Sequence, residues 1–280
     1  HRLGQRLGPA LQEQSHIGGA LTLGGVACIA GGTLHPIVDG EAHSVEALQA
    51  VGSPWATATP FPWRNHTASL QWYVGLPTSA INFDVANACL GFVNGLMMAS
   101  TLVDAGQVDY AVVVASEDAS KVQDATVENL HASTTNRGNF MEQFASLTLG
   151  CGAAAAVVGS IEDHPDAHRI VRGITRAGTD HHDLCVGDHR GMYTDSTALL
   201  NDGLELVMDA WNDTPGEWAW RDADRFITHQ VSQLHTNAIS ESAGLPLDRI
   251  PTTFPVLGNV GPASLPITLV REMDELSAGD

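Results

Sequence analysis

A strand–helix–strand pattern in the first half of the chain constrains the fold more than any other feature. It consists of a short strand over Ala80–Val85, a helix over about Leu90–Ala105 and a near-continuous apolar strand over Asp109–Ser116. Gly106 stands where a helix-terminating glycine belongs. Strand, helix and strand in about 35 residues form a parallel crossover unit, and an unbroken apolar run is typical of a strand that is buried on both faces. The sequence therefore predicts an α/β fold with a parallel sheet.

The rest of the chain predicts a second half that follows the same logic. Polar residues again stand where strands give way to helices, which is where open parallel sheets build their sites. The remaining predicted elements are strands over Leu147–Gly159 and Arg225–Thr228, a helix over Val231–Ala243 that ends at Gly244, an extended stretch over Pro251–Leu257, a turn over Gly258–Ser264 and a helix over Leu265–Leu276.

Three parts follow from this pattern. Residues 1–66 lack clean periodicity, and we predict an aberrant or incomplete N-terminal segment there. Residues 67–160 form the N-terminal half, which carries a candidate nucleophile. Residues 161–280 form the C-terminal half, and Trp211–Asp224 is expected to be a surface connection.

Composition excludes several classes of function. The 280 residues carry a formal charge of −19, which argues against nucleic acid or an anionic membrane surface as the main partner. No apolar run is long enough to span a bilayer. The four cysteines have no CxxC or disulfide-framework spacing, so we expect a cytoplasmic, reducing environment.

Cys89 is the candidate nucleophile because it follows a strand and opens a helix. Unpaired backbone N–H groups and the helix dipole at such a position favour the thiolate, by about 0.3–2 kcal/mol for the dipole. That contribution is too small to act alone, so a partner is required. The alternative is a small buried core cysteine. We expect Cys151 and Cys185 to be inert.

His229 and Asn259 are the candidate partners of Cys89. Both stand at turns that follow predicted strands, so two related halves can bring them together over the cysteine. Histidine can take a proton or donate a hydrogen bond, and the asparagine amide can donate a second one. Together they could hold a thioester carbonyl or the enolate derived from it.

From about residue 67 to 280 the chain resembles the thiolase superfamily, in its 3-oxoacyl-acyl-carrier-protein synthase III branch. Within that branch it is most similar to the acyl-CoA condensing enzymes of bacterial olefin biosynthesis, the OleA type; the motif HQVS, where priming synthases usually carry HQAN, is the best marker. The motifs that carry the resemblance are Asn82–Gly95, Phe144–Gly150, His229–Thr236 and Thr253–Ser264. The resemblance implies a thiolase-like fold of two related α/β halves, layered αβαβα, incomplete at both ends and lacking its last core strand.

The same resemblance implies roles for the site residues. Cys89 would accept an acyl group from one acyl-CoA, and His229 and Asn259 would form the oxyanion hole for the second. In enzymes of the OleA type, a glutamate from the partner subunit of a dimer removes the α-proton. The matching stretch here, Pro60–His66, holds no acid, so the base is unassigned; Glu41 and Glu46 are the nearest candidates. Glu117 is expected to be a structural carboxylate at the floor of the site.

The function predicted is therefore a non-decarboxylative Claisen condensation of two long-chain acyl-CoAs. Acyl-CoA is a substrate, no cofactor or metal is expected, and a homodimer and downstream olefin-pathway enzymes are the expected partners. The first alternative is a decarboxylating synthase III that uses a malonyl donor, and the second is a catalytically defective chain. The loop Asp180–Cys185, although rich in histidine, is interpreted as a solvated loop or pocket wall and not as a zinc site, because its candidate ligands are crowded.

Overall fold

The computed structural model describes residues 47–52, 66–132, 136–165, 167–188, 191–214, 220–273 and 275–276. The chain forms two compact units. The described residues of the first fall within 47–52, 66–116 and 152–171, and those of the second within 117–151 and 172–276. No helix among the described residues is long and apolar enough to cross a membrane.

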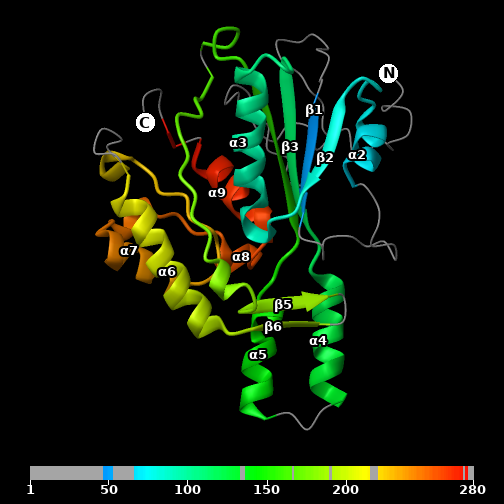
Figure 1. The fold of residues 1–280 in the computed structure, drawn as a ribbon. Coiled ribbons are helices and arrows are strands. Elements are labelled where there is room, and N and C mark those ends of the chain that lie inside the picture. Colours follow the sequence, from blue (N-terminus) through cyan, green and yellow to red (C-terminus); the bar gives the residue numbers. More distant parts are fainter. Residues whose placement is uncertain are drawn as a thin grey trace. The chain divides into compact units, whose positions relative to one another are not determined.

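A four-stranded sheet organises the first unit (Figure 1). Its strands are β1 (Ala47–Gly52), β2 (Ile81–Val85), β3 (Tyr110–Glu117) and β4 (Gly152–Gly159), in the order β2-β1-β3-β4. β1 lies parallel to both of its neighbours. The predicted parallel sheet is thus confirmed.

β1 comes from the segment that we predicted to be aberrant. Ala47 pairs with Ile81 of β2 and with Ala111 of β3, so these six residues lie between the two strands of the crossover unit. This strand was not predicted from the sequence, because Ala47–Gly52 mixes small, polar and apolar residues without a clear alternation. Glu41 and Glu46 lie outside the described residues.

Two helices pack on this sheet. α2 (His66–Val74) contacts β1 and β2, and α3 (Gly91–Asp104) contacts β1, β2 and β4. Gly91, Gly95 and Ala99 are buried at four-residue spacing along α3, which lets backbone approach this face closely. After α3 the chain turns at Gly106, which has a φ of +64° as its predicted role requires.

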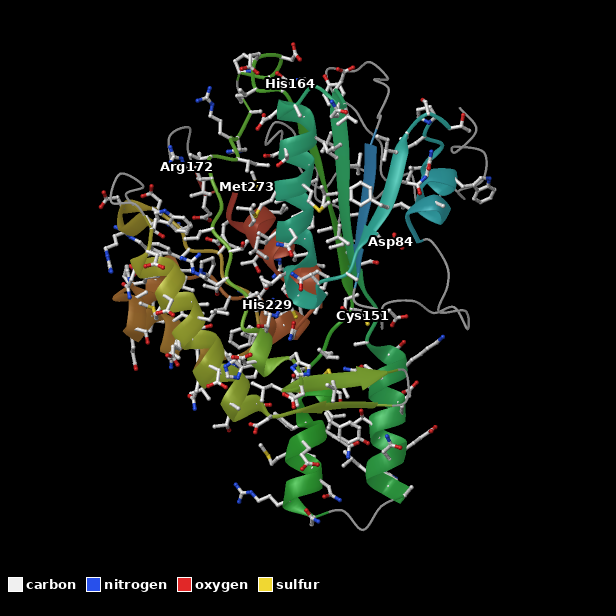
Figure 2. The ribbon with its side chains drawn as sticks, in the orientation of Figure 1. Asp84, Cys151, His164, Arg172, His229 and Met273 are labelled. Carbon is white, nitrogen blue, oxygen red and sulfur yellow. The ribbon has the colours of Figure 1, made fainter. Side chains whose placement is uncertain are left out.

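An apolar cluster on one face of the sheet forms part of the core of the first unit. Val112 of β3 and Val157 of β4 are buried together with the half-buried Leu70 and Leu76. At the rim, Tyr110 Oη lies 2.9 Å from Nε2 of His164, which Figure 2 labels. This hydrogen bond ties the residues after β4 back to the first residue of β3.

The second unit begins with a helix pair covered by a hairpin (Figure 1). α4 (Ser120–Ala132) and α5 (Arg137–Leu147) pack against each other, and Thr126 and Ser146 share a buried hydrogen bond of 2.8 Å. The antiparallel strands β5 (Cys185–Asp188) and β6 (Gly191–Thr194) follow, and β6 packs on both helices. None of α4, α5, β5 or β6 was predicted from the sequence.

The rest of the second unit is helical. Asp195 caps α6, and Ser232 caps α7, which ends at Gly244 with the left-handed φ of +66° that glycine allows. Ala243, Leu245 and Ile250 form a buried apolar cluster. The elements are α6 (Ser196–Asn212), α7 (Gln233–Ala243), α8 (Phe254–Leu257), the 3₁₀ turn η6 (Gly261–Ala263) and α9 (Ser264–Met273).

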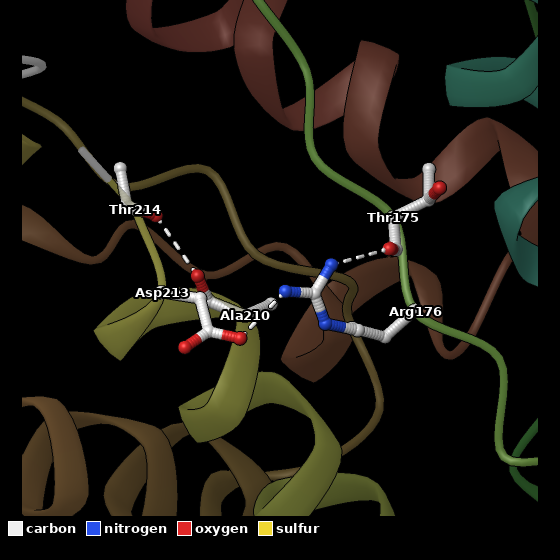
Figure 3. Close-up of polar contacts among 5 residues, drawn as sticks. All are labelled: Thr175, Arg176, Ala210, Asp213 and Thr214. Atoms are coloured by element: carbon white, nitrogen blue, oxygen red, sulfur yellow. Dashed lines mark hydrogen bonds and ion pairs between the residues drawn. The ribbon is translucent and has the colours of Figure 1, made fainter.

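An ion pair ties the segment before β5 to the end of α6 (Figure 3). Nη2 of Arg176 lies 2.7 Å from Oδ2 of Asp213, and Nη1 donates to the Thr175 carbonyl. Thr214 Oγ1 donates to the Ala210 carbonyl and so closes the helix end. Exposed pairs of this kind contribute about 0–1 kcal/mol, so this one orients the segment more than it stabilises the fold.

Three predicted elements differ from the structure. The strand expected over Leu147–Gly159 begins only at Gly152, because Leu147 is the last residue of α5. Arg225–Thr228 is not a strand; its Phe226 N–H donates to the Arg249 carbonyl. The stretch Pro251–Leu257 is not helical before Phe254, where α8 begins. Pro255 is tolerated in the first turn of α8, because its fixed φ suits a helix and its missing N–H has no partner there.

Candidate active site

Cys89 lies in a short 3₁₀ turn, η1 (Ala88–Leu90), between β2 and α3 in the first unit. Ala88, directly before it, has a φ of +40° and is the one non-glycine residue in the described ranges with a positive φ. Such a conformation costs on the order of 1–3 kcal/mol and persists only where the surroundings impose it. The half-buried cysteine therefore lies at a strand-to-helix turn, as predicted, and the positive φ of Ala88 shows in addition that this turn is strained.

Two contacts hold this turn against the helix. The Asn87 side-chain amide donates to Oδ1 of Asn94 on α3, and the Leu90 N–H donates to the Asn87 carbonyl at 2.9 Å. The connection is thereby tied to the first turns of α3. The Cys89 side chain is thus held at the N-terminal end of a helix, where the dipole favours a thiolate.

His229 belongs to the second unit and is labelled in Figure 2. The next residue, Gln230, is almost fully buried, and its hydrogen bonds fix the backbone beside His229. The Gln230 amide nitrogen donates to the carbonyls of Thr228 and Pro251, and its oxygen accepts from the Thr253 N–H at 2.7 Å. The Gln230 side chain thus links the irregular segment that ends at His229 to the segment that precedes Asn259.

The His229 ring is held in its neutral form. Burial, and then repulsion from His235, lower the pKa of His229 from 6.5 to about 4. Its Nδ1 is buried and has no hydrogen-bond partner among the described residues. A neutral imidazole carries one N–H donor and one acceptor nitrogen, so it can donate to a carbonyl oxygen without bringing a charge.

The lowered pKa of His229 predicts acid sensitivity of the fold. Unfolded His229 takes up a proton near pH 6.5, whereas the folded residue stays neutral down to about pH 4, so protonation stabilises the unfolded chain in this window. Unfolding free energy should fall as the pH drops from 6.5 to 4, by at most about 3 kcal/mol from this residue. Urea titrations at pH 7 and 4.5 measure it.

The matched control for that measurement is His229→Asn. This variant keeps a polar side chain of similar reach but cannot be protonated, so its loss of stability over the same pH interval should be smaller. Equal losses in the two proteins would contradict a depressed pKa at His229.

His235 is the ionisable group that repels a charge on His229. It lies on the first turn of α7 and is half-buried, and burial lowers its own pKa. Its Nδ1 is 2.9 Å from Oγ of Ser232, the residue that caps α7. The serine of the HQVS motif thus has two structural tasks, because it starts the helix and it orients this second histidine.

Asn259 lies in a turn whose backbone is fixed on both sides. Its N–H donates to the Thr148 carbonyl at 2.9 Å, and its carbonyl accepts from the Gly150 N–H at 2.8 Å. Its side-chain oxygen accepts from the Gly261 N–H at 3.0 Å. The amide nitrogen, which is the donor end, is therefore directed away from Gly261. The amide nitrogen is the end of the side chain that could donate to an oxyanion.

The catalytic residues predicted from the sequence fall in both units. Cys89 lies in the first, and His229 and Asn259 lie in the second. Their convergence over a substrate stays a prediction. Sequence reasoning missed the roles of Gln230 and Gly150, although both stand inside the motifs that carry the resemblance, directly after His229 and at the end of Phe144–Gly150.

The histidine-rich loop has ordinary polar contacts. His181 Nδ1 lies 3.2 Å from Oδ2 of Asp202 on α6, and Cys185 Sγ lies 3.4 Å from the Thr194 hydroxyl. Within the described ranges no three His, Cys, Asp or Glu side chains lie close enough to hold a metal ion. That the protein needs no metal stays a prediction. The other inert candidate, Cys151, donates to Oδ1 of Asp118 at 3.6 Å.

Known proteins share this sequence and this fold. Two family models match the chain: 3-oxoacyl-[acyl-carrier-protein (ACP)] synthase III over residues 83–172 and its C-terminal counterpart over residues 216–280. An acyl-CoA:acyl-CoA alkyltransferase of Xanthomonas campestris pv. campestris is 40% identical over 212 residues, which are 74% of this chain and 62% of the relative. A Shewanella oneidensis protein of the same name is 30% identical, over 74% of this chain and 64% of that protein. The chain thus spans less than two thirds of the length of these relatives.

The structural match supports the same grouping. A crystal structure of a cysteine-to-serine variant of Xanthomonas campestris OleA, with bound lauric acid and lauroyl-CoA, superposes with a TM-score of 0.79 at 34% identity. The match covers 85% of this chain and 70% of that one. The predicted thiolase-like α/β fold is confirmed. The chain therefore belongs to the 3-oxoacyl-[acyl-carrier-protein] synthase III family of the thiolase superfamily, on its OleA-like branch.

Proposed function

We propose that this chain is an acyltransferase that condenses two long-chain acyl-CoAs without loss of carbon dioxide. The observation that carries the proposal is Cys89, held at a strained turn before α3, in a chain that is 40% identical to an acyl-CoA:acyl-CoA alkyltransferase. The neutral ring of His229 and the directed amide of Asn259 support it, because both can donate to an oxyanion.

The reaction proceeds in two steps. The Cys89 thiolate attacks the carbonyl of the first acyl-CoA, and the coenzyme A thiolate leaves. A base then removes the α-proton of the second acyl-CoA, whose enolate oxygen His229 and Asn259 stabilise. The α-carbon attacks the acyl-cysteine carbonyl, the carbon–sulfur bond to Cys89 breaks, and a β-ketoacyl thioester forms.

The base and the partners belong to the proposal as well. We propose that the α-proton is removed by a glutamate from the partner subunit of a homodimer, as the resemblance to the OleA type implies. In this chain Glu41 and Glu46 are the nearest acids before the matching stretch. We also place the enzyme in the cytoplasm, with olefin-pathway enzymes downstream.

A decarboxylating synthase III is the second candidate function. A β-ketoacyl-[acyl-carrier-protein] synthase III of Geobacillus kaustophilus is 28% identical over 230 residues, and the stretch Pro60–His66 holds no acid. A malonyl donor would need no separate base, because loss of carbon dioxide generates the carbanion. The net charge of −19 opposes this candidate, since carrier proteins are themselves acidic.

Substrate pairs distinguish the two functions. We expect lauroyl-CoA alone to give a β-ketoacyl thioester and one coenzyme A thiol per condensation, with no carbon dioxide, because the enolate arises by proton removal. Mass spectrometry of the product and a thiol assay measure this. Condensation only when a malonyl thioester is added, with release of labelled carbon dioxide, would establish the synthase III alternative. Failure of both reactions would indicate the defective chain.

A further inference from the structure

Glu117 is a buried acid that the proposed reaction does not use. It is the last residue of β3, belongs to the second unit and is 6% exposed. Its Oε1 is buried and has no hydrogen-bond partner among the described residues. An ionised carboxylate in such a place would be costly, so a buried acid of this kind needs either a function or a neutral form.

The carboxyl group lies directly against the turn that carries Asn259. A Cβ placed on Gly261 would lie 3.2 Å from Cδ of Glu117 and would collide with its Oε2. Gly261 has a φ of +51°, and its N–H is the donor that fixes the Asn259 side-chain oxygen. Glu117 therefore packs on the one residue whose backbone N–H sets the direction of the Asn259 amide.

The same turn is also tightly packed at Gly258. A Cβ on Gly258 would lie 2.8 Å from the Thr148 carbonyl oxygen, and one on Gly150 would collide with the Leu257 carbonyl oxygen. The backbone of the turn is thus in close contact both with the segment that follows α5 and with the Glu117 side chain. Removing the Glu117 side chain would remove one of these close contacts and leave space into which the turn could move.

We propose that Glu117 is a positioning residue of the condensation step, whose buried carboxyl group supports Gly261 and thereby fixes the donor end of the Asn259 amide. This rests on the proposed function insofar as Asn259 serves the second acyl group. The distinction from a catalytic acid or base is chemical: a support needs only its shape and a neutral form, whereas an acid must give up a proton and a base must accept one.

The electrostatics agree with a neutral support. Burial, and then repulsion from Asp118, raise the pKa of Glu117 from 4.5 to about 7. Asp118 is the ionisable group beside it, and its own pKa is lowered, chiefly by hydrogen bonds from Ser120. The turn Gly258–Ser264 brings no ionisable side chain, and the thiol of Cys151 donates to Asp118. Glu117 is thus mainly protonated below pH 7 and increasingly charged above it.

The experiment compares Glu117→Ala and Glu117→Gln in three measurements. The first is the rate of Cys89 acylation by lauroyl-CoA, the second is condensation turnover from pH 6 to 8.5, and the third is hydrogen exchange of the peptide over residues 254–264. Glu117→Ala should slow condensation about 10–100-fold, since a misplaced group costs up to about 100-fold, while acylation stays within about twofold. Exchange in the peptide should become faster.

Glu117→Gln is the variant that separates support from chemistry. It keeps the shape and cannot ionise, so we expect wild-type condensation at pH 6 and normal exchange in the peptide. It should also retain at pH 8.5 the activity that the wild type loses as Glu117 becomes charged. A Glu117→Gln protein as impaired as Glu117→Ala at pH 6 would overturn the proposal and make the carboxyl group a participant in proton transfer.

Hydrogen exchange tests the proposal without depending on the substrate, because unchanged exchange in Glu117→Ala would overturn it whatever the reaction is. Equal losses of acylation and condensation in Glu117→Ala would also overturn it, because they indicate general damage to the fold. If the wild type condenses no acyl-CoAs, the proposed function fails. Faster exchange in Glu117→Ala but not in Glu117→Gln would then still establish the support of the turn.

Discussion

Replacing Cys89 with serine is expected to abolish acyl transfer to the protein. Incubation with lauroyl-CoA should add one acyl group to the wild-type chain, and intact-protein mass spectrometry should detect none on Cys89→Ser. The reason is that the N-terminal end of a helix can stabilise a thiolate, whereas a serine hydroxyl remains protonated without an adjacent base. We expect a loss of acylation rate of at least about 1,000-fold, since the nucleophile itself is removed.

The matched controls are Cys151→Ser and Cys185→Ser. Both residues are exposed and lie in the second unit, and neither stands at the start of a helix. Both variants should acquire the adduct as the wild type does. An adduct that persists on Cys89→Ser, or disappears only when one of the other two is changed, would refute Cys89 as the nucleophile.

His229→Ala and Asn259→Ala should each lower condensation turnover by about 100–1,000-fold, the usual effect of removing one oxyanion-hole donor. Acylation of Cys89 should change much less, because in the proposed reaction the pair binds the second thioester. Quenched single-turnover reactions that separate the acyl-enzyme from the β-keto product measure the two steps. The double variant should lose less than the product of the two single losses, because the donors act on one oxygen.

Exposed residues of the same types provide controls for that pair. His182→Ala changes an exposed histidine of the second unit, and Asn201→Ala changes an exposed asparagine on α6. Both should leave turnover within about twofold, as surface substitutions generally do. If either control matches the loss in His229→Ala or Asn259→Ala, the loss does not report an oxyanion hole.

Elements whose signals are local could be predicted from the sequence. Gly106 and Gly244 end their helices because each adopts a left-handed conformation that other residues avoid. A glycine that follows a predicted helix therefore predicts this conformation from the sequence alone. The apolar run of β3 is likewise visible in the chain itself. β1 carries a weaker local signal, because both of its partner strands lie elsewhere in the chain. The strands of the hairpin β5–β6 have four residues each, which is too short for a clear alternation.

The site shows the same limit. Cys89 could be recognised from its own neighbours, since a cysteine between a strand and a helix is a local pattern. The packing of the turn that carries Asn259 could not, because it involves Gly150 and Glu117, which are distant in sequence and become neighbours of the turn only in the fold. A contact between backbone and a buried acid leaves no periodic trace in the chain.

The place of β1 between β2 and β3 has a consequence for how the chain acquires its structure during synthesis. Ala47 emerges from the ribosome first, yet its partners Ile81 and Ala111 follow much later. Until Tyr110–Glu117 has been made, β1 has one neighbour, and both strands expose backbone groups that can pair elsewhere. Such long-range parallel pairing closes large loops and is intrinsically slow. During synthesis the chain therefore passes through a stage in which the sheet next to the Cys89 turn is incomplete and its strand edges are exposed.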